Sequence, residues 1–370
     1  MKFIPIARPI VNNREAKNVS STIKSGWITM GKKVKELENK ISKYIGVKHA
    51  ILFNNGTSSL HAALIALGVK KGDEVIVPTL SYISSANVIE YCGAKPVFCE
   101  ISPETFNVTY ETIRKKITKR TKAIITVDLK GMPIDYDQIR KLKKKFKIPI
   151  LSDSAEAFGA MYKENKVGSQ MDVHSFSFFA NKNITMGEGG LVTTNNNKIA
   201  KICQIIRNQG QKSRYNHIML GNNYRPTDYA ASMGLSQLKR VDYILKEKSK
   251  IASIYHKEFS KNKYIEAPFV PSYVGKHSWY MYCIKFKKPI NRKKIQNHLH
   301  KKNIETRLSF PPIHLQKYYK DKYNYKKKMF GISESTFDAF LDIPIFPGIT
   351  KKQMNYVVKN ILDAVNLQLK

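Results

Sequence analysis

The chain is poor in acidic residues. Of its 370 residues only 28 are Asp or Glu, against 64 Lys or Arg, so the formal net charge is +36. This balance excludes an acidic, solvating chain. It does not indicate a disordered basic tail either, because 42% of the residues are hydrophobic and the positive residues are spread among apolar segments. The length fits one large α/β domain with a smaller companion.

Cysteine is also scarce. The four cysteines, Cys92, Cys99, Cys203 and Cys283, form no C-x-x-C pair and have no histidine at metal-ligand spacing. The spacing therefore excludes a disulfide framework, and no metal site is expected. A reducing cytosol is the default compartment for such a chain.

Long apolar runs are missing. No stretch approaches the ~20 apolar residues that a membrane helix requires. The first ten residues, MKFIPIARPI, carry prolines and an arginine where a signal peptide needs an apolar stretch. We therefore expect a cytoplasmic protein without a membrane partner.

Arginine is rare among the basic residues, supplying 11 of the 64. Arginine is the residue that reads guanine edges and grips phosphate in a bidentate manner. The densest basic runs, such as Lys141–Lys147, are typical of solvated helix faces or loops, and no nucleic-acid-binding signature accompanies them. No specific nucleic-acid partner is expected. A regulator associated with nucleic acid is kept as the hypothesis that the charge alone would favour.

Short apolar strands alternate with helices over the first 200 residues. Strands are predicted at 50–54, 74–78, 96–101, 123–127, 149–152, 175–179 and 191–194. This rhythm predicts a mostly parallel sheet covered on both faces. A long helix beginning near Thr227 leads into an α+β pattern, so we expect a large domain at 1–245 and a small C-terminal domain at 246–370.

Residues in three segments of the sequence together indicate one kind of chemistry. Lys182 follows a predicted strand and precedes a glycine-rich turn, a setting in which a desolvated amine can form a Schiff base. Asp153 ends another strand, where a carboxylate can keep a pyridinium nitrogen protonated. Gly56-Thr57-Ser58 opens a helix, where amides and hydroxyls can bind a phosphate. Individually these are also consistent with a surface lysine and two helix N-caps. Together they indicate a pyridoxal-phosphate (PLP) enzyme.

An ordered set of motifs along nearly the whole chain resembles the DegT/DnrJ/EryC1/StrS family of sugar aminotransferases, and within it the GDP-perosamine synthases most. The motifs include Ser25-Gly26-Trp27, Asn55–Leu60, Pro78–Tyr82, Asp153–Ala160, Ser175–Gly190, Gly221–Arg225, Glu305–Arg307, Pro312–His314 and Pro344–Gly348. The resemblance implies an α/β fold of PLP fold type I, like aspartate aminotransferase. It also implies a homodimer with two shared active sites.

By the same resemblance, Lys182 would bond covalently to PLP and later move protons. Asp153 would pair with the pyridine nitrogen, Tyr82 would stack on the ring, and Glu156 would lie near the ring's 3-hydroxyl. The resemblance implies further roles for six residues: Thr57, Ser58 and Ser177 at the phosphate, Asn223 at the partner subunit's phosphate, and Trp27, Arg307 and His314 as candidates for sugar and diphosphate contacts. For the last three, packing or surface roles are an equal alternative.

The implied reaction moves an amino group from L-glutamate to C4 of a nucleotide-linked 4-keto-6-deoxyhexose. A GDP-perosamine-type product is the first expectation, and a UDP- or dTDP-linked, viosamine-like sugar is the alternative. A lysine at 182 disfavours the related sugar 3-dehydratases, which carry histidine there. The sequence departs from the perosamine-synthase pattern at Lys130, at Leu308-Ser309 and at Ala180, and these positions leave the sugar and the nucleotide open.

Overall fold

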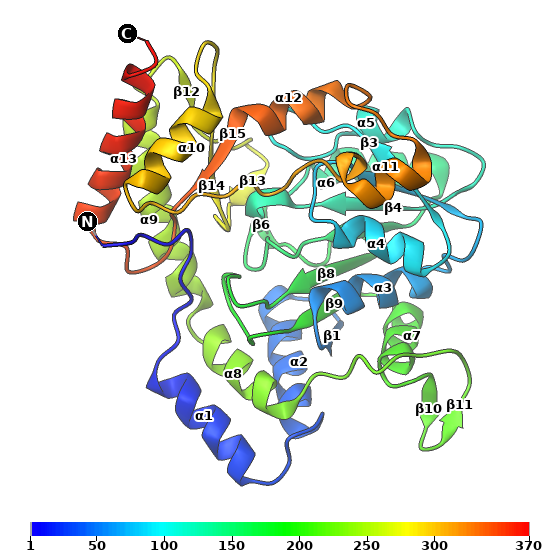
Figure 1. Cartoon of the computed structure of the whole chain (residues 1–370). Helices are drawn as coiled ribbons and strands as arrows, with labels where there is room; N and C mark the ends of the chain where they lie inside the picture. The colour runs from blue at the N-terminus through cyan, green and yellow to red at the C-terminus, as the bar shows by residue number, and fades with distance from the viewer. Residues whose placement is uncertain (1, 370) are drawn as a thin grey trace.

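The structure is a computed structural model that describes residues 2–369. Its larger unit is built on a seven-stranded sheet with the order β1-β9-β8-β5-β4-β2-β3 (Figure 1). The pairs β8–β5, β5–β4, β4–β2 and β2–β3 are parallel, and β9 runs antiparallel to both of its neighbours. The prediction of a mostly parallel sheet is confirmed. The strands are β1 (His49–Phe53), β2 (Glu74–Pro78), β3 (Lys95–Cys99), β4 (Thr121–Val127), β5 (Ile150–Asp153), β8 (Val173–Ser177) and β9 (Gly190–Thr194).

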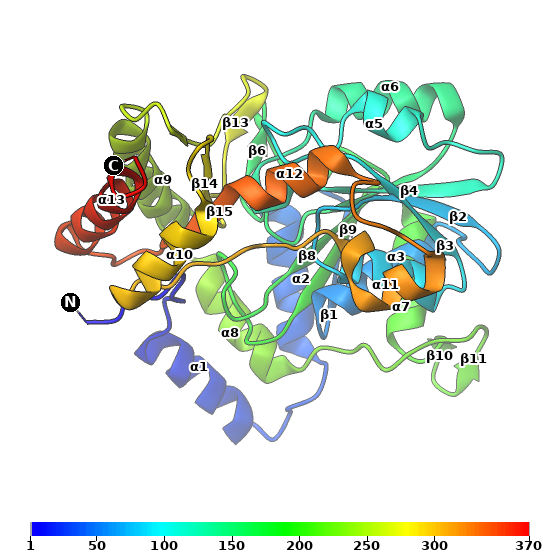
Figure 2. The ribbon, with the colours of Figure 1, turned by 45° about the horizontal axis from the view of Figure 1, so that its top comes forward.

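Alternate residues of each strand enter two separate apolar clusters, one on each face of the sheet. In β4, Ile124 belongs to the cluster that contains α2, α5, α6 and α8, and Ile125 to the cluster that contains α3, α4 and α7. Side chains of a strand point alternately to opposite faces, so a sheet covered on both sides needs apolar residues at successive positions. Figure 2 shows α5 and α6 over one face. The helices of this unit are α1 (Asn13–Lys24), α2 (Lys32–Ile45), α3 (Gly56–Ala66), α4 (Ser84–Tyr91), α5 (Tyr110–Arg114), α6 (Tyr136–Phe146), α7 (Asn197–Arg207) and α8 (Asp228–Leu238).

A smaller α+β unit follows, with its own apolar cluster. Its three-stranded sheet has the order β12-β14-β15, and α9, α10 and α13 pack with it at the left of Figure 1. The elements are α9 (Val241–Phe259), β12 (Ile265–Glu266), β14 (Tyr282–Phe286), α10 (Arg292–Lys301), β15 (Phe340–Ile343) and α13 (Lys351–Asn366).

The chain crosses between the two units more often than the sequence predicted. Ile4 belongs to the small unit's cluster and forms a parallel bridge with Ile304. Conversely, Tyr319 and Phe330, from the segment of α11 and α12, pack into the large unit's cluster. The predicted division at 245/246 falls inside α9. Whether the two parts behave as separate domains stays a prediction.

The remaining elements are short. Two small sheets contain β10–β11 and β13-β6-β7, and the single long helix expected from Thr227 is divided at Lys239–Arg240 into α8 and α9. Within residues 2–369 no helix combines the length and apolar character needed to cross a membrane. These elements are β6 (Met161–Tyr162), β7 (Asn165–Lys166), β10 (Gln211–Ser213), β11 (Asn216–His217), β13 (Val274–Lys276), α11 (Lys317–Tyr323), α12 (Gly331–Ala339) and two 3-10 turns, η1 (Leu129–Gly131) and η2 (Ile313–Leu315).

Candidate active site

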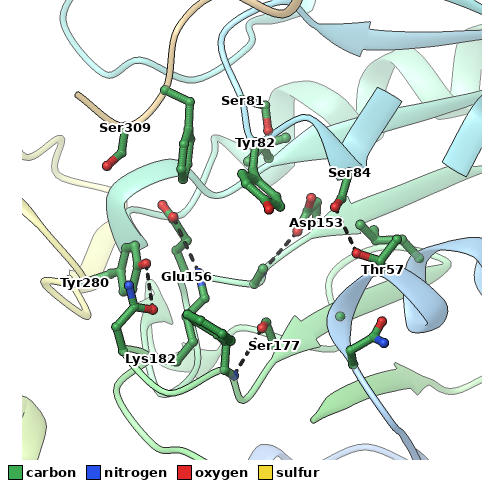
Figure 3. A pocket seen from close by; sticks show the side chains of 18 of the residues that line it. Thr57, Ser81, Tyr82, Ser84, Asp153, Glu156, Ser177, Lys182, Tyr280 and Ser309 are labelled. Atoms are coloured by element: carbon green, nitrogen blue, oxygen red, sulfur yellow. Dashed lines mark hydrogen bonds and ion pairs between the residues drawn. The ribbon is translucent and has the colours of Figure 1, made fainter. Parts of the chain in front are cut away.

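A cavity of about 730 Å³ opens where the parallel strands end. Strand β5 ends at Asp153, β8 ends at Ser177, and the segments after β1 and β2 bring further side chains to the same edge. Ligand sites of open α/β sheets gather at this edge. Eight residues named from the sequence line the cavity: Thr57, Ser58, Tyr82, Asp153, Glu156, Ser177, Lys182 and Arg307. Figure 3 labels all of them except Ser58 and Arg307.

Asp153 is the buried carboxylate at the floor of the cavity. Its Oδ2 accepts a hydrogen bond of 2.7 Å from Ser85 Oγ, and its Oδ1 accepts one of 3.2 Å from the amide of Ala155. Burial raises the pKa of Asp153, and these hydrogen bonds, with the nearby Lys182, oppose that rise. A cation placed beside Oδ1 or Oδ2 would therefore stabilise the ionised carboxylate.

Lys182 lies across the cavity from Asp153 (Figure 3). Its Nζ is 3.6 Å from Glu156 Oε1 and 4.0 Å from the centre of the Tyr280 ring. Burial lowers the pKa of Lys182, but Tyr280 and the Glu156 carboxylate outweigh burial and raise it overall. The other oxygen of Glu156 accepts a 2.7 Å hydrogen bond from the amide of Lys130. Glu156, itself fixed by this hydrogen bond, thus holds the amine in position.

The N-terminus of α3 forms the anion-binding end of the cavity. Asn55 caps the helix and its side chain accepts from the amide of Ser58 at 2.8 Å, while Thr57 Oγ1 lies 2.8 Å from Ser84 Oγ. A Cβ on Gly56 would lie 3.0 Å from Ser177 Cβ, so glycine keeps the space between α3 and β8 open. Free amides at a helix N-terminus together with hydroxyls suit a phosphate.

An aromatic side chain covers the cavity from above. Tyr82 is 55% exposed, and its ring centre lies 5.2 Å from that of Phe310, which precedes η2. A planar ring can therefore enter the cavity beside Tyr82, between the anion-binding end of α3 and Lys182. The described side chains include a carboxylate for a ring nitrogen, an amine for an aldehyde and a site for a phosphate, so they fit PLP.

Three of the residues named from the sequence do not line this cavity. Trp27 and Asn223 are exposed on the described chain, and Asn223 forms a bridge with Asn208. His314 is fully buried, with Nδ1 2.6 Å from Thr79 Oγ1 and Nε2 3.2 Å from Glu334. This placement gives His314 a structural role in holding η2 and offers no direct contact with a ligand in the cavity.

Sequence reasoning missed several side chains that shape the site. Ser85 bonds to Asp153, and Tyr280 faces Lys182 from the small unit. Lys248, on α9, is buried, donates a 2.8 Å hydrogen bond to Asn183 Oδ1, and has its pKa lowered by burial to about 7. The helical spacing of apolar residues in α9 predicts only that one face of the helix is buried. No pattern in the sequence marks Lys248 on that face as part of a site. Among residues 2–369, no group of three or more His, Cys, Asp or Glu side chains could hold a metal ion.

The comparisons agree with this geometry. The DegT/DnrJ/EryC1/StrS aminotransferase family model matches residues 9–362. The chain is 38% identical to GDP-perosamine synthase of Escherichia coli O157:H7, with 98% of each chain covered. It is 31% identical to UDP-4-amino-4-deoxy-L-arabinose–oxoglutarate aminotransferase of Shewanella sediminis, with 98% of each covered. Streptococcus pneumoniae Spr1654, solved in its PMP form, superposes with a TM-score of 0.92 at 30% identity over 100% of both chains.

Fold and site together define a PLP-dependent sugar aminotransferase, since a mostly parallel sheet presents the lysine, the carboxylate and the helix N-terminus in one cavity. The chain belongs to the DegT/DnrJ/EryC1/StrS aminotransferase family.

Proposed function

We propose that the protein transfers the amino group of L-glutamate to C4 of a nucleotide-linked 4-keto-6-deoxyhexose. The observation that carries the proposal is the placement of Lys182 Nζ 3.6 Å from Glu156, in the same cavity as Asp153 and the N-terminus of α3. When bound, PLP supplies the electron sink that takes up and returns an amino group.

In this mechanism the chain supplies position, charge and one mobile proton. Thr57, Ser58 and Ser177 would hold the phosphate, and Asp153 would keep the ring nitrogen protonated. Tyr82 would stack on the ring, and Glu156, which lies 3.6 Å from Lys182 Nζ, would orient the ring's 3-hydroxyl and the lysine. Lys182 Nζ then removes the proton from the donor's carbon and later delivers one to the sugar carbon that gains the amino group. Arg307, which lines the cavity with its guanidinium 3.3 Å from Glu305, is a candidate for an anionic group of a substrate.

The relatives' names support the sugar class. One is called a GDP-perosamine synthase and another an oxoglutarate aminotransferase of a UDP-linked 4-amino sugar. A GDP-linked acceptor is our first choice, because this chain is 38% identical to the GDP-perosamine synthase and 31% identical to the aminotransferase named for a UDP-linked sugar. A UDP- or dTDP-linked, viosamine-like product is the second candidate, motivated by the departures at Lys130 and Leu308-Ser309.

We propose further that two copies form a homodimer with shared active sites. The β10–β11 hairpin projects from the body of the chain (Figure 1), and Tyr215, Ile218 and Leu220 on and beside it are 78%, 53% and 91% exposed. Apolar side chains exposed together are typical of a covered interface. Asn223 follows this hairpin and would reach the partner's phosphate. Sedimentation measures the mass of the protein in solution. A mass of one chain under assay conditions would contradict the proposed homodimer.

The decisive experiment is a panel of GDP-, UDP- and dTDP-linked 4-keto-6-deoxysugars offered with glutamate, with the products identified by mass. We expect an amino sugar from the GDP-linked compound and none from the Lys182→Ala variant. The control is Lys144→Ala, which removes an exposed lysine of α6. Full turnover by Lys182→Ala, or no turnover of any ketosugar by the unaltered protein, would reject the proposed function.

A further inference from the structure

A buried lysine outside the cavity touches the cavity wall. Lys130 follows β4, and its side chain is 4% exposed. Its Nζ donates to both oxygens of Asp342 in β15, at 2.7 and 2.8 Å, and lies 4.4 Å from the centre of the Phe340 ring. The pair joins the large unit to the small one and is separate from the groups assigned to PLP.

We propose that Lys130 is a positioning residue for the acceptor sugar: with Asp342 it fixes the wall Leu308-Ser309-Phe310, and thereby sets the affinity for the ketosugar. The inference rests on the proposed function and deepens it. Lys130 Nζ also donates to the carbonyl oxygen of Ser309, and the amide of Ser309 donates to Asp342 Oδ2 at 3.0 Å. Both backbone groups of Ser309 are therefore bound to the ion pair.

The position of this wall makes it a sugar contact. Leu308, Ser309 and Phe310 line the cavity on the side of Tyr82. Ser309 lies across the cavity from Thr57 at the start of α3 (Figure 3), so this wall is placed to contact a substrate and not the phosphate of PLP. Ser309 and Lys130 are also two of the positions at which the sequence departs from the pattern of perosamine synthases, and here they are in direct contact.

Arg307 is held independently of Lys130. Its amide donates to the Asp342 carbonyl at 3.2 Å, and its carbonyl accepts from the Asp342 amide at 3.0 Å. Glu156 is bound by the main-chain amide of Lys130, which the Lys130→Met variant retains. Loss of the Lys130 side chain should therefore release the wall and leave Arg307, Glu156 and Lys182 in place.

The test compares Lys130→Met, Asp342→Asn and the double variant with the unaltered protein. Lys130 has a φ of +62°, and methionine keeps its length and its backbone restriction. The single Lys130→Met variant leaves a buried carboxylate without its cation, so the double variant should have the higher Tm. The matched control is Arg240→Met, which breaks another buried ion pair, with Glu15, that contributes nothing to the cavity lining.

Two measurements are made on each protein. The first is the rate at which the cofactor's absorbance is lost on adding glutamate. The second is the steady-state kinetics with the ketosugar that the unaltered protein uses best, which gives its KM. In the double variant we expect the KM for the ketosugar to rise about tenfold, while the glutamate step stays within about twofold. Asp342→Asn keeps the shape of the side chain, and we expect the KM for the ketosugar to rise about threefold in this variant. Arg240→Met should change the Tm and neither rate.

Unchanged ketosugar KM in Asp342→Asn and in the double variant would overturn the inference, and so would an equal fall of both rates. If the unaltered protein turns over no ketosugar, the proposed function fails and this inference fails with it. If the unaltered protein is active and only the variants behave contrary to expectation, the inference alone fails.

Discussion

At the scale of single residues, the site depends on the side chains that surround its charged groups. Asp153 is buried, and burial favours its neutral form. Ser85 Oγ supplies the shortest hydrogen bond to it, at 2.7 Å, and thereby favours the ionised form that a pyridinium nitrogen requires. The carboxylate's proposed role is therefore shared with a serine of α4.

Ser85→Ala should weaken PLP binding. A hydrogen bond to a charged group contributes about 1.5 kcal/mol or more, so we expect the Kd for PLP to rise roughly tenfold. Ser59→Ala is the matched control, because Ser59 Oγ is equally buried, bonds Ser175 Oγ at 2.6 Å and lies outside the cavity lining. Titration with PLP, followed by absorbance, measures the Kd for PLP of both variants. An equal rise of the Kd in the two variants would assign Ser85 a merely structural role.

The sequence predicts Lys182, Asp153 and Thr57 because each stands at a strand end or helix start, which local patterns reveal. It does not predict Ser85, Tyr280 or Lys248, since their roles arise from contacts between distant segments. Tyr280 reaches Lys182 from 98 positions away, across the two units. His314 is the opposite case: its motif is recognisable, and the fold buries it against Thr79 and Glu334, outside the cavity lining, in agreement with the packing alternative.

At the scale of elements, the N-terminus of α3 is fitted closely against β8. Gly56→Ala adds one carbon 3.0 Å from Ser177 Cβ and 3.3 Å from its Oγ. Either the helix start or the serine must shift by a few tenths of an ångström. In the proposed function both hold the phosphate, so the geometry of that proposed site must change.

We expect Gly56→Ala to raise the Kd for PLP about tenfold, which corresponds to about 1.4 kcal/mol, with a small change in Tm. Gly331→Ala, at the start of α12, is the control, because an added Cβ there meets nothing within 4 Å and the backbone is not left-handed. Equal PLP affinities for the two variants would show that α3 does not hold the phosphate.

The predicted bounds match the observed ones where a continuous apolar run defines the strand, as in β2, predicted and observed at 74–78. The break between α8 and α9 was missed, because helical spacing continues through it and the turn at Lys239–Arg240 contains neither glycine nor proline. α7 was missed although a typical Asn196 cap precedes it. α11 is short and rich in lysine and tyrosine, which leaves almost no apolar period to detect.

At the scale of the whole molecule, buried histidines couple folding to pH. Burial lowers the pKa of His174 to about 3, from an ordinary 6.5. Its Nδ1 lies 2.9 Å from Ser154 Oγ, and its Nε2 accepts from the amide of Met171 at 3.1 Å, so the ring is bound in its neutral form. The unfolded chain binds a proton near pH 6.5 and the folded chain does not, so stability falls as pH falls below 6.5 towards 3.

Between pH 6.5 and pH 5 we expect His174 to account for a loss of about 2 kcal/mol in the free energy of unfolding. Urea unfolding at the two pH values measures it. The His174→Gln variant should show a pH dependence smaller by that amount, whatever its absolute stability. The same dependence in both proteins would mean that His174 is not held neutral by the fold.

The net charge of +36 belongs to the same scale. On α6, Lys141, Lys144 and Lys145 are exposed, whereas Lys143 pairs with Asp172 at 2.7 Å. Replacing the three exposed lysines by glutamine should leave kcat within about twofold at physiological salt, because exposed charges beyond a Debye length are screened. A large fall in kcat would show that the charge of this face matters for catalysis. A salt-dependent shift with DNA at physiological salt, together with no transamination of any nucleotide-linked ketosugar, would favour the nucleic-acid hypothesis.

The backbone hydrogen bonds between the segment Ile4–Ile6 and much later residues have a consequence for folding during synthesis. The amide of Ile4 donates to Asn303, the amide of Glu305 donates back to Ile4, and the amide of Ile345 donates to Ile6. At about 5–20 residues per second, the ribosome needs tens of seconds to deliver these partners after the first residues emerge. The segment Ile4–Ile6 thus waits without these partners until Ile345 has been translated, and until then the small unit's apolar cluster lacks Ile4.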